Sequence, residues 1–122
     1  MCQYKHQELT RNIINAAYKV HNTLGCGFLE KVYHKALVVE LDKRGFSIQS
    51  QKPISVKYEN QVVGEYFADI VVEDKVIVEV KAVEKINSIF EAQLLNYLKA
   101  SELKVGLIVN FADLVQIKRM VL

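Results

Sequence analysis

An uninterrupted apolar segment in the last quarter of the chain limits what this sequence can fold into. Val105-Gly106-Leu107-Ile108-Val109 carries no polar side chain, and a strand of this composition is buried on both faces of its sheet. A second, largely β-branched strand is predicted at Val76–Val80, and Ser88–Ala100 between the two has its apolar residues at helical spacing. The order strand, helix, strand predicts a parallel pair joined by a right-handed crossover helix.

Two further helices are predicted ahead of the sheet. Apolar residues recur at helical spacing from Glu8 to Leu24, and Gly25-Cys26-Gly27 ends that helix, because glycine readily adopts the left-handed conformation found at helix ends. A second helix is expected from about Leu29 to Arg44, with Gly45 at its end. We expect both helices to pack against the sheet.

After Gly45 the apolar residues alternate with polar ones, which is the pattern of strands. The predicted strands are Phe46–Gln51, Ile54–Tyr58, Val62–Val72, Val76–Val80, Lys104–Phe111 and Val115–Val121. With the three helices they give the order α-α-β-β-β-β-α-β-β, an α/β fold with a mixed sheet flanked by helices. At 122 residues and 14.0 kDa the chain suits one domain spanning residues 1–122.

Composition argues against several classes of protein. No apolar run approaches the ~20 residues needed to cross a bilayer, so no membrane association is expected. The first residues, Met1–His6, lack the apolar core of a secretory signal, and we expect a cytoplasmic location. Cys2 and Cys26 lack metal-binding spacing and a secretory context, which predicts reduced thiols and no zinc.

The net charge of +2 is too small to indicate nucleic-acid binding by itself, but the charges are unevenly distributed. Residues 1–57 contain nine Lys/Arg and four Asp/Glu, whereas residues 58–122 contain seven Lys/Arg and ten Asp/Glu. An acidic site is therefore expected in the second half of the chain, and any phosphate-facing surface is expected to draw on the first.

Three charged side chains stand out because they lie in or next to apolar strands. Asp69 lies within Val62–Val72, and Glu79 and Lys81 share one face of the following strand. If residues 73–75 form a three-residue loop, antiparallel pairing places Asp69 opposite Glu79, with Cβ atoms ~5 Å apart. A slip of one residue in the register would separate them.

Two carboxylates at that distance repel each other, and on apolar strands they also lose hydration. Mg²⁺ would neutralise them, because it binds carboxylates, a backbone carbonyl and several waters. Lys81 would then hold or activate an attacking water and offset charge that develops on a phosphate. A salt-bridged hairpin, in which Lys81 only neutralises Asp69 and Glu79, explains the same pattern equally well.

Other polar residues also have structural explanations. Gln93 and Tyr97 lie four positions apart and share a face of the third helix. Glu30 opens the second helix, where the helix dipole favours a carboxylate whatever its function. His21 is interpreted as a packed or hydrogen-bonded histidine, and Tyr33 as a core residue.

A family signature is recognisable in Gly27-Phe28-Leu29-Glu30-Lys31-Val32-Tyr33, which matches the pattern Gly-x-x-Glu-x-x-Tyr. The resemblance continues in order through Val20-His21-Asn22-Thr23-Leu24-Gly25, Ala68-Asp69, Glu79-Val80-Lys81-Ala82, Ala92-Gln93-Leu94-Leu95-Asn96-Tyr97-Leu98-Lys99 and Val109-Asn110-Phe111. The chain thus resembles the GxxExxY proteins of the PD-(D/E)XK nuclease superfamily, which has a restriction-endonuclease-like core. The element order predicted from periodicity agrees with that core.

The resemblance implies a nuclease that hydrolyses phosphodiester bonds in DNA or RNA with Mg²⁺ or Mn²⁺. Asp69 and Glu79 resemble the two metal-binding acids, and Lys81 resembles the motif lysine that assists the attacking water. The Val80 carbonyl is a further candidate metal ligand. Glu30 resembles the extra acid that many superfamily members supply from a helix before the sheet, where it holds metal through water.

Gln93 and Tyr97 resemble the Gln-x-x-x-Tyr motif of the exonuclease-like branch, which positions the active site and the nucleic-acid strand. Two positions depart from the family pattern. Phe90 stands where many members have His, which removes a candidate phosphate contact. Phe67-Ala68 stands where a proline usually precedes the first acid.

Two other functions are consistent with the same residues. The chain has little beyond a minimal core, so a non-cleaving nucleic-acid-binding or protein-interaction module is the alternative to a nuclease. A homodimer or a partner protein would supply target recognition in either case. A structural domain whose acids only staple the hairpin is a third interpretation, which a clear separation of Asp69 from Glu79 would support.

Overall fold

The computed structural model describes residues 6–122 and contains three helices and five strands within them. They are α1 (Gln7–Leu24), α2 (Glu30–Lys43), β1 (Ile48–Tyr58), β2 (Gln61–Val72), β3 (Val76–Lys81), α3 (Ser88–Ser101), β4 (Val105–Phe111) and β5 (Val115–Val121). The strands form one sheet in the order β1-β2-β3-β4-β5. β3 and β4 are parallel and the other neighbours are antiparallel, so α3 is the predicted crossover helix.

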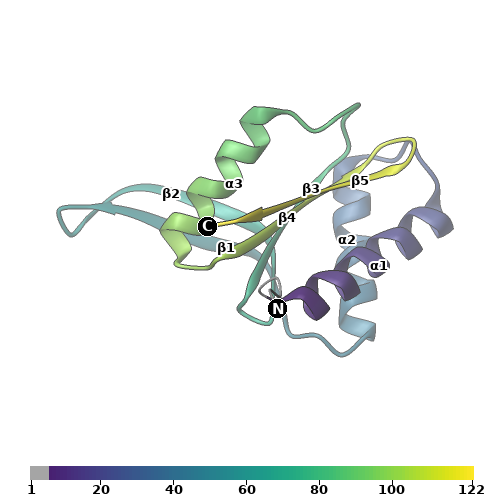
Figure 1. Ribbon diagram of the computed structural model, residues 1–122, viewed down its shortest axis with the longest axis horizontal. Helices are drawn as coiled ribbons and strands as arrows, with labels where there is room; N and C mark the ends of the chain where they lie inside the picture. The colour runs from purple at the N-terminus through teal and green to yellow at the C-terminus, as the bar shows by residue number, and fades with distance from the viewer. Residues whose placement is uncertain (1–5) are drawn as a thin grey trace, which may run out of the picture.

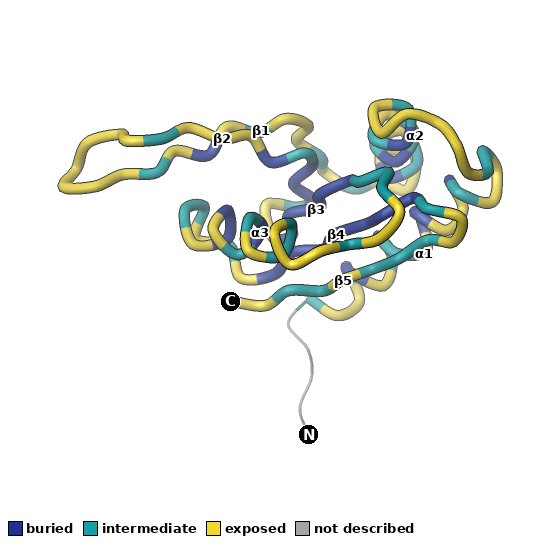
Figure 2. The backbone as a smooth tube through the Cα atoms, turned by 90° about the horizontal axis from the view of Figure 1, so that it is seen from above, coloured by how far each residue is buried: buried dark blue, intermediate teal, exposed yellow. Residues whose placement is uncertain are grey.

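The sheet lies between two helical layers (Figures 1 and 2), with α1 and α2 on one face and α3 on the other. Residues of β3 alternate between the two cores: Val78 and Val80 pack with α1 and α2, whereas Ile77 packs with α3. β4 is buried along its whole length, as the apolar run predicted. The same alternation places Glu79 and Lys81 on the α3 side.

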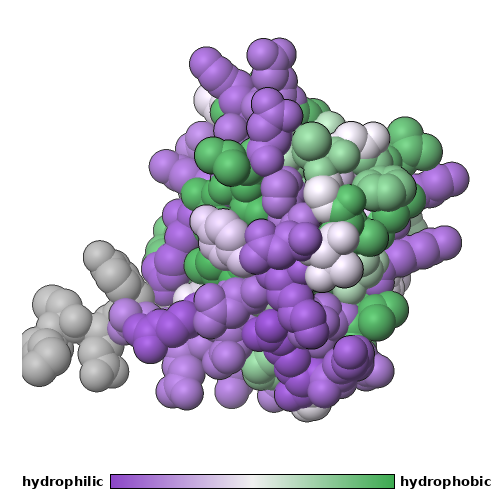
Figure 3. Space-filling view, turned by 90° about the vertical axis from the view of Figure 1, so that its right-hand side faces the viewer, coloured by the Kyte–Doolittle hydropathy of each residue, from purple (hydrophilic) through white to green (hydrophobic). Residues whose placement is uncertain are grey.

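Helices α1 and α2 bury one face each and expose the other. The buried residues of α1 recur at helical spacing and are Thr10, Ile13, Ala16, Ala17 and Val20. At the end of the molecule that carries these helices, hydrophilic side chains cover the lower part and the top of the view in Figure 3, and apolar ones gather between them. Within residues 6–122, no helix combines the length and the apolar character that a membrane crossing requires.

The prediction of four strands between the second and third helices is wrong, because the structure has three there. Phe46–Gln51 and Ile54–Tyr58 were predicted as separate strands, but they belong to the single strand β1, which continues through Pro53. β1 is an edge strand, and proline is accepted there because one side of the strand has no partner to bond.

β1 and β2 are irregular at Gln51 and Asp69. The register places these residues opposite each other, but they do not pair, although the residues before and after them do. Gln51 has a φ of 55°, in the left-handed region that costs free energy for residues other than glycine. Beyond this break, residues 52–68 leave the sheet as a two-stranded projecting hairpin (Figures 1 and 2).

The connection between β2 and β3 has the predicted length. Residues 73–75 form the loop, and the register places Asp69 across from Glu79. Backbone pairing between the two strands ends one residue earlier, at Ile70 and Val78. The strands therefore separate at the two carboxylates.

Helix α3 is fixed at its start and at its middle. Asn87 caps the start of the helix by accepting hydrogen bonds at Oδ1 from the N–H groups of Ile89 and Phe90 at 2.9 and 3.1 Å. Leu94 packs directly on Gly106 of β4, where a Cβ would lie 2.8 Å from Leu94 Cδ1. This close approach sets the distance between α3 and the sheet.

Of the two cysteines, Cys26 is an exposed free thiol, as predicted. Cys2 lies outside the described residues, as does most of the Met1–His6 segment that was examined for a secretory signal.

Replacing Gln51 by glycine should stabilise the fold. Glycine adopts positive φ without the Cβ clash, which outweighs its larger loss of entropy on folding, so Gln51→Gly should raise the free energy of unfolding by about 0.5 kcal/mol. Gln51→Val should lower it by about 1–2 kcal/mol. Urea denaturation measures both. Gln49→Gly, at an exposed residue of β1 with regular pairing to Val71, is the matched control and should destabilise.

Candidate active site

Asp69 and Glu79 bridge the gap that opens between β2 and β3. The Asp69 N–H donates to Glu79 Oε2 at 2.9 Å, and the Val80 N–H donates to Asp69 Oδ2 at 2.8 Å. Each acid thus accepts a hydrogen bond from a backbone N–H of the opposite strand, beyond the point where backbone pairing ends. The two acids therefore hold β2 and β3 together. Within the described chain, Asp69 Oδ1 and Glu79 Oε1 accept no hydrogen bond and are available to another partner.

Glu79 is the most perturbed acid of the site. Its residue is only 5% exposed, and burial raises the pKa of Glu79 to about 8, with the nearby charges of Asp69 and Glu30 adding to the increase. The hydrogen bond from the Asp69 N–H and the charge of Lys81 oppose this increase. Without a cation, the pair therefore keeps a proton on Glu79 at neutral pH.

Lys81 does not neutralise the acids directly. Its ammonium group lies over the ring of Phe90, with Nζ 4.6 Å from the ring centroid, which is a cation–π geometry. The ion pairs within 4.0 Å among residues 6–122 include neither acid of the site and do not include Lys81. The salt-bridged hairpin considered from the sequence is therefore not the arrangement of these side chains.

Gln93 and Tyr97 lie on α3, the helix that covers the face of the sheet on which the acids lie. Gln93 Nε2 donates to Tyr97 Oη at 2.9 Å. Burial raises the pKa of the Tyr97 hydroxyl, and the charges of Glu79 and Asp69 raise it further. The predicted polar face of α3 thus lies within electrostatic reach of the carboxylates.

Glu30 is not part of the carboxylate pair. It is exposed in the first turn of α2, although its charge contributes to the raised pKa of Glu79. Within residues 6–122, no three His, Cys, Asp or Glu side chains lie close enough together to hold a metal ion. Asp69 and Glu79 are therefore the two carboxylates that lie together, and the Val80 peptide adjoins them.

Tyr33 is a core residue, as predicted. Its hydroxyl donates to the Gly25 carbonyl at 2.6 Å and accepts from the Phe28 N–H at 3.2 Å. Its ring stacks on Phe111, with centroids 4.5 Å apart. The tyrosine of the signature therefore fixes the loop that leads into Glu30.

Two further side chains, His21 of α1 and Asn110 of β4, form hydrogen bonds near the end of β4, and only His21 had been interpreted from the sequence. His21 Nε2 lies 2.9 Å from the Ala112 carbonyl, in agreement with a hydrogen-bonded histidine. Asn110 is fully buried and bonds both the N–H and the carbonyl of Val83 at 2.9 Å. This side chain holds the segment that follows Lys81, and its amide at the end of an apolar run was the sequence signal for it.

Removing the Tyr33 hydroxyl should loosen the loop before α2. Tyr33→Phe leaves the Gly25 carbonyl and the Phe28 N–H without this partner, and should lower the free energy of unfolding by about 1–2 kcal/mol in urea denaturation. Tyr18→Phe, at a partly exposed tyrosine of α1, is the control and should change stability by less than about 0.5 kcal/mol. Equal effects of the two substitutions would contradict the assigned role.

Glu79 should make the metal-free protein less stable as pH rises. Its folded pKa of about 8 exceeds the ordinary value of 4.5, so the folded state holds a proton that the unfolded chain releases between those values. The free energy of unfolding should fall across this window, by up to about 1.4 kcal/mol per pH unit.

Chemical denaturation at a series of pH values, with EDTA present, measures this dependence. Glu79→Gln cannot ionise and should flatten the decline, whereas Glu65→Gln, in the exposed part of β2, should keep the wild-type slope. An unchanged slope in Glu79→Gln would show that Glu79 is ionised in the folded protein.

Comparison with known proteins places this geometry in a family. The family model described as the PD-(D/E)XK nuclease superfamily matches residues 7–120, whereas no curated protein sequence matches the chain. The solved structure "Crystal structure of SSO0001" is similar with a TM-score of 0.57 at 15% sequence identity. The similarity covers 96% of this chain and 59% of that one, so the chain spans little more than half of that protein's length. At this identity the similarity concerns the fold alone. Because the family match spans nearly the whole sequence, this chain belongs to the PD-(D/E)XK nuclease superfamily.

Proposed function

We propose that this chain is a metal-dependent nuclease that hydrolyses phosphodiester bonds in DNA or RNA. The observation that carries the proposal is a pair of adjacent carboxylates, Asp69 and Glu79, that no cationic side chain of the described residues pairs with. Burying such a pair is costly unless a positive charge is bound between them.

The donor set fits Mg²⁺ or Mn²⁺. Hard divalent cations bind carboxylate and carbonyl oxygens, and Mg²⁺ retains several waters, so a site with few protein oxygens suits it. Asp69 and Glu79 would hold the ion, the Val80 carbonyl would add a ligand, and Glu30 would contact it through water. When bound, the ion would polarise a phosphoryl oxygen and lower the pKa of a coordinated water.

The chain's own residues then have separate roles. With a cation bound, Glu79 would release its proton to solvent, because the positive charge would offset the burial and the charge of Asp69 that raise its pKa. Lys81, held over Phe90, directs its ammonium group to the attacking water and to the charge that develops on the phosphate. Gln93 and Tyr97 hold the nucleic-acid strand against the site from α3.

The contacts of Tyr33 support assigning the chain to the GxxExxY proteins within the superfamily. Tyr33 is buried in the core, whereas Glu30, at the first residue of α2, is exposed to solvent. The tyrosine anchors the Gly25–Phe28 loop, and the glutamate that begins α2 is positioned by that anchor.

We propose that residues 1–122 act as one catalytic domain.

The alternative is a non-cleaving module on the same fold, and one observation favours it. One oxygen of each acid is already engaged by a backbone N–H, and no third acid joins the pair within the described residues. A homodimer or a partner protein would supply the target-recognition surface in this case.

Cleavage assays on single- and double-stranded DNA and RNA, with Mg²⁺ or Mn²⁺, distinguish the two functions. The nuclease proposal predicts metal-dependent cleavage that Asp69→Asn abolishes and that Lys81→Met reduces by about 100-fold. Lys85→Met, at an exposed lysine four residues further on, is the control and should keep wild-type activity.

Isothermal calorimetry with Mn²⁺ separates the two activities. Metal binding that depends on Asp69, without cleavage of any of these substrates, would support the non-cleaving module. No metal binding by the wild-type protein would overturn the nuclease proposal.

A further inference from the structure

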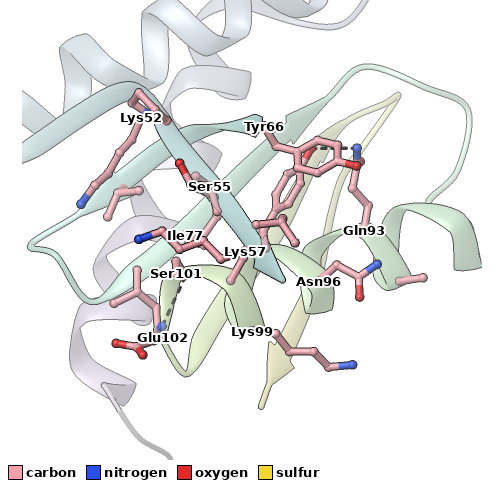
Figure 4. Close-up of a pocket in the computed structure, with 18 of the residues that line it drawn as sticks. Lys52, Ser55, Lys57, Tyr66, Ile77, Gln93, Asn96, Lys99, Ser101 and Glu102 are labelled. Carbon is pink, nitrogen blue, oxygen red and sulfur yellow. Dashed lines mark hydrogen bonds between the residues drawn. The ribbon is translucent and has the colours of Figure 1, made fainter. Parts of the chain in front are cut away.

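A groove of about 1280 Å³ lies between the projecting hairpin and α3, on the same side of the sheet as the acids. Its walls include Lys57 and Tyr66 from the hairpin and Gln93, Asn96, Tyr97 and Lys99 from α3. Figure 4 shows Tyr66 next to Gln93 at one end of the groove and Lys99 further along α3. No residue of this hairpin was assigned a function from the sequence.

The groove lies on the same face of the sheet as the candidate active site and close to it. Val71 and Ile77 line it, and each lies two residues along its strand from Asp69 or Glu79, so the side chains face the same way. Tyr97 also lines the groove and lies close enough to both acids for their charges to raise the pKa of its hydroxyl. A chain-like ligand in the groove would therefore reach the carboxylates.

Tyr66 presents an aromatic surface in this groove. It is 48% exposed, and its ring centroid lies 5.6 Å from that of Tyr97 at an interplanar angle of 42°. Gly64 lies beside the ring, since a Cβ there would be in ordinary contact with Tyr66 Cε2 at 3.5 Å. The tyrosine is thus supported on two sides while part of the ring stays open to a planar ligand.

The charges of the groove are modest and mixed. Lys52 pairs with Asp74 at 3.4 Å, whereas no ion pair among the described residues engages Lys57 or Lys99. With a net charge of +2 for the whole chain, phosphate attraction alone gives weak binding. Stacking must supply much of the affinity, and only unpaired bases offer their faces to a tyrosine.

We propose that this groove binds single-stranded nucleic acid, with a base stacked on Tyr66 and phosphates near Lys57 and Lys99. The strand would then run along α3 past Gln93 and Tyr97 to Asp69 and Glu79. The role of this strand as a substrate rests on the proposed nuclease function, whereas its binding does not require cleavage.

Fluorescence anisotropy with the full chain and EDTA tests binding without hydrolysis. The probes are labelled oligothymidylate, oligouridylate and a DNA duplex of the same length. The two single strands should bind more tightly than the duplex. Tyr66→Leu should weaken single-strand binding about tenfold, and Tyr66→Phe, which keeps the ring, should retain it. Tyr58→Leu, at an exposed hairpin tyrosine outside the groove lining, is the matched control.

Salt titration adds a second measurement. Lys57→Gln and Lys99→Gln should each reduce the slope of log K against log salt by about 0.7, the contribution of one phosphate contact on a single strand. A preference for oligouridylate over oligothymidylate would identify RNA as the ligand, through contacts to the 2′-hydroxyl, and the reverse preference would identify DNA.

Three outcomes would overturn the inference: no single-strand binding by the wild type, tighter binding of the duplex, or equal binding by Tyr66→Leu and wild type. Asp69→Asn separates this inference from the proposed function, because it should bind the single strand normally while failing to cleave. Tyr66-dependent binding without metal-dependent cleavage by the wild type would support the groove and contradict the nuclease. Metal-dependent cleavage by the wild type, together with unchanged single-strand binding in Tyr66→Leu, would support the nuclease and contradict the groove.

Discussion

Backbone pairing around Asp69 ends on both sides of β2, and the rest of the site depends on how the two acids replace it. Toward β1, the left-handed Gln51 interrupts the ladder. Toward β3, the Asp69 N–H and the Val80 N–H bond to carboxylates in place of carbonyls. An unsatisfied buried N–H costs about as much as a lost hydrogen bond, so the acids hold the strands at a fixed separation. The carboxylates of Asp69 and Glu79 are thereby brought together on the α3 side of the sheet.

The hydrogen bonds that stabilise the fold at Asp69 and Glu79 also set the electrostatics of the two acids. The bonds that hold the carboxylates also keep them close, and burial together with the charge of Asp69 raises the pKa of Glu79. In the metal-free protein a proton on Glu79 avoids two buried charges at neutral pH, and a bound cation would take the place of that proton. The surrounding contacts keep the geometry in place: Asn110 anchors Val83 after β3, Phe90 supports Lys81, and Gly106 brings α3 close to the sheet.

Local pattern was sufficient for the three helices, for all strands except β1 and for the register at the site. The three-residue loop and the alternation along β2 and β3 placed Asp69 opposite Glu79, and apolar spacing identified the helices. The two strands predicted at Phe46–Gln51 and Ile54–Tyr58 form the single strand β1, because an edge strand accepts Pro53. The left-handed Gln51 has no compositional signal, because glutamine seldom adopts that conformation. The Lys81–Phe90 contact and the groove at Tyr66 depend on where α3 and the hairpin lie in space, which spacing along the chain does not specify.

The central claim is that Asp69 and Glu79 bind one divalent cation between them. Anomalous diffraction from crystals of the full chain soaked in Mn²⁺ tests it most directly, because manganese is located without reference to activity. We predict one peak bonded to an oxygen of each acid, and its loss in crystals of Asp69→Asn. A map without a peak at these oxygens, in crystals that bind Mn²⁺ elsewhere or not at all, would contradict the account.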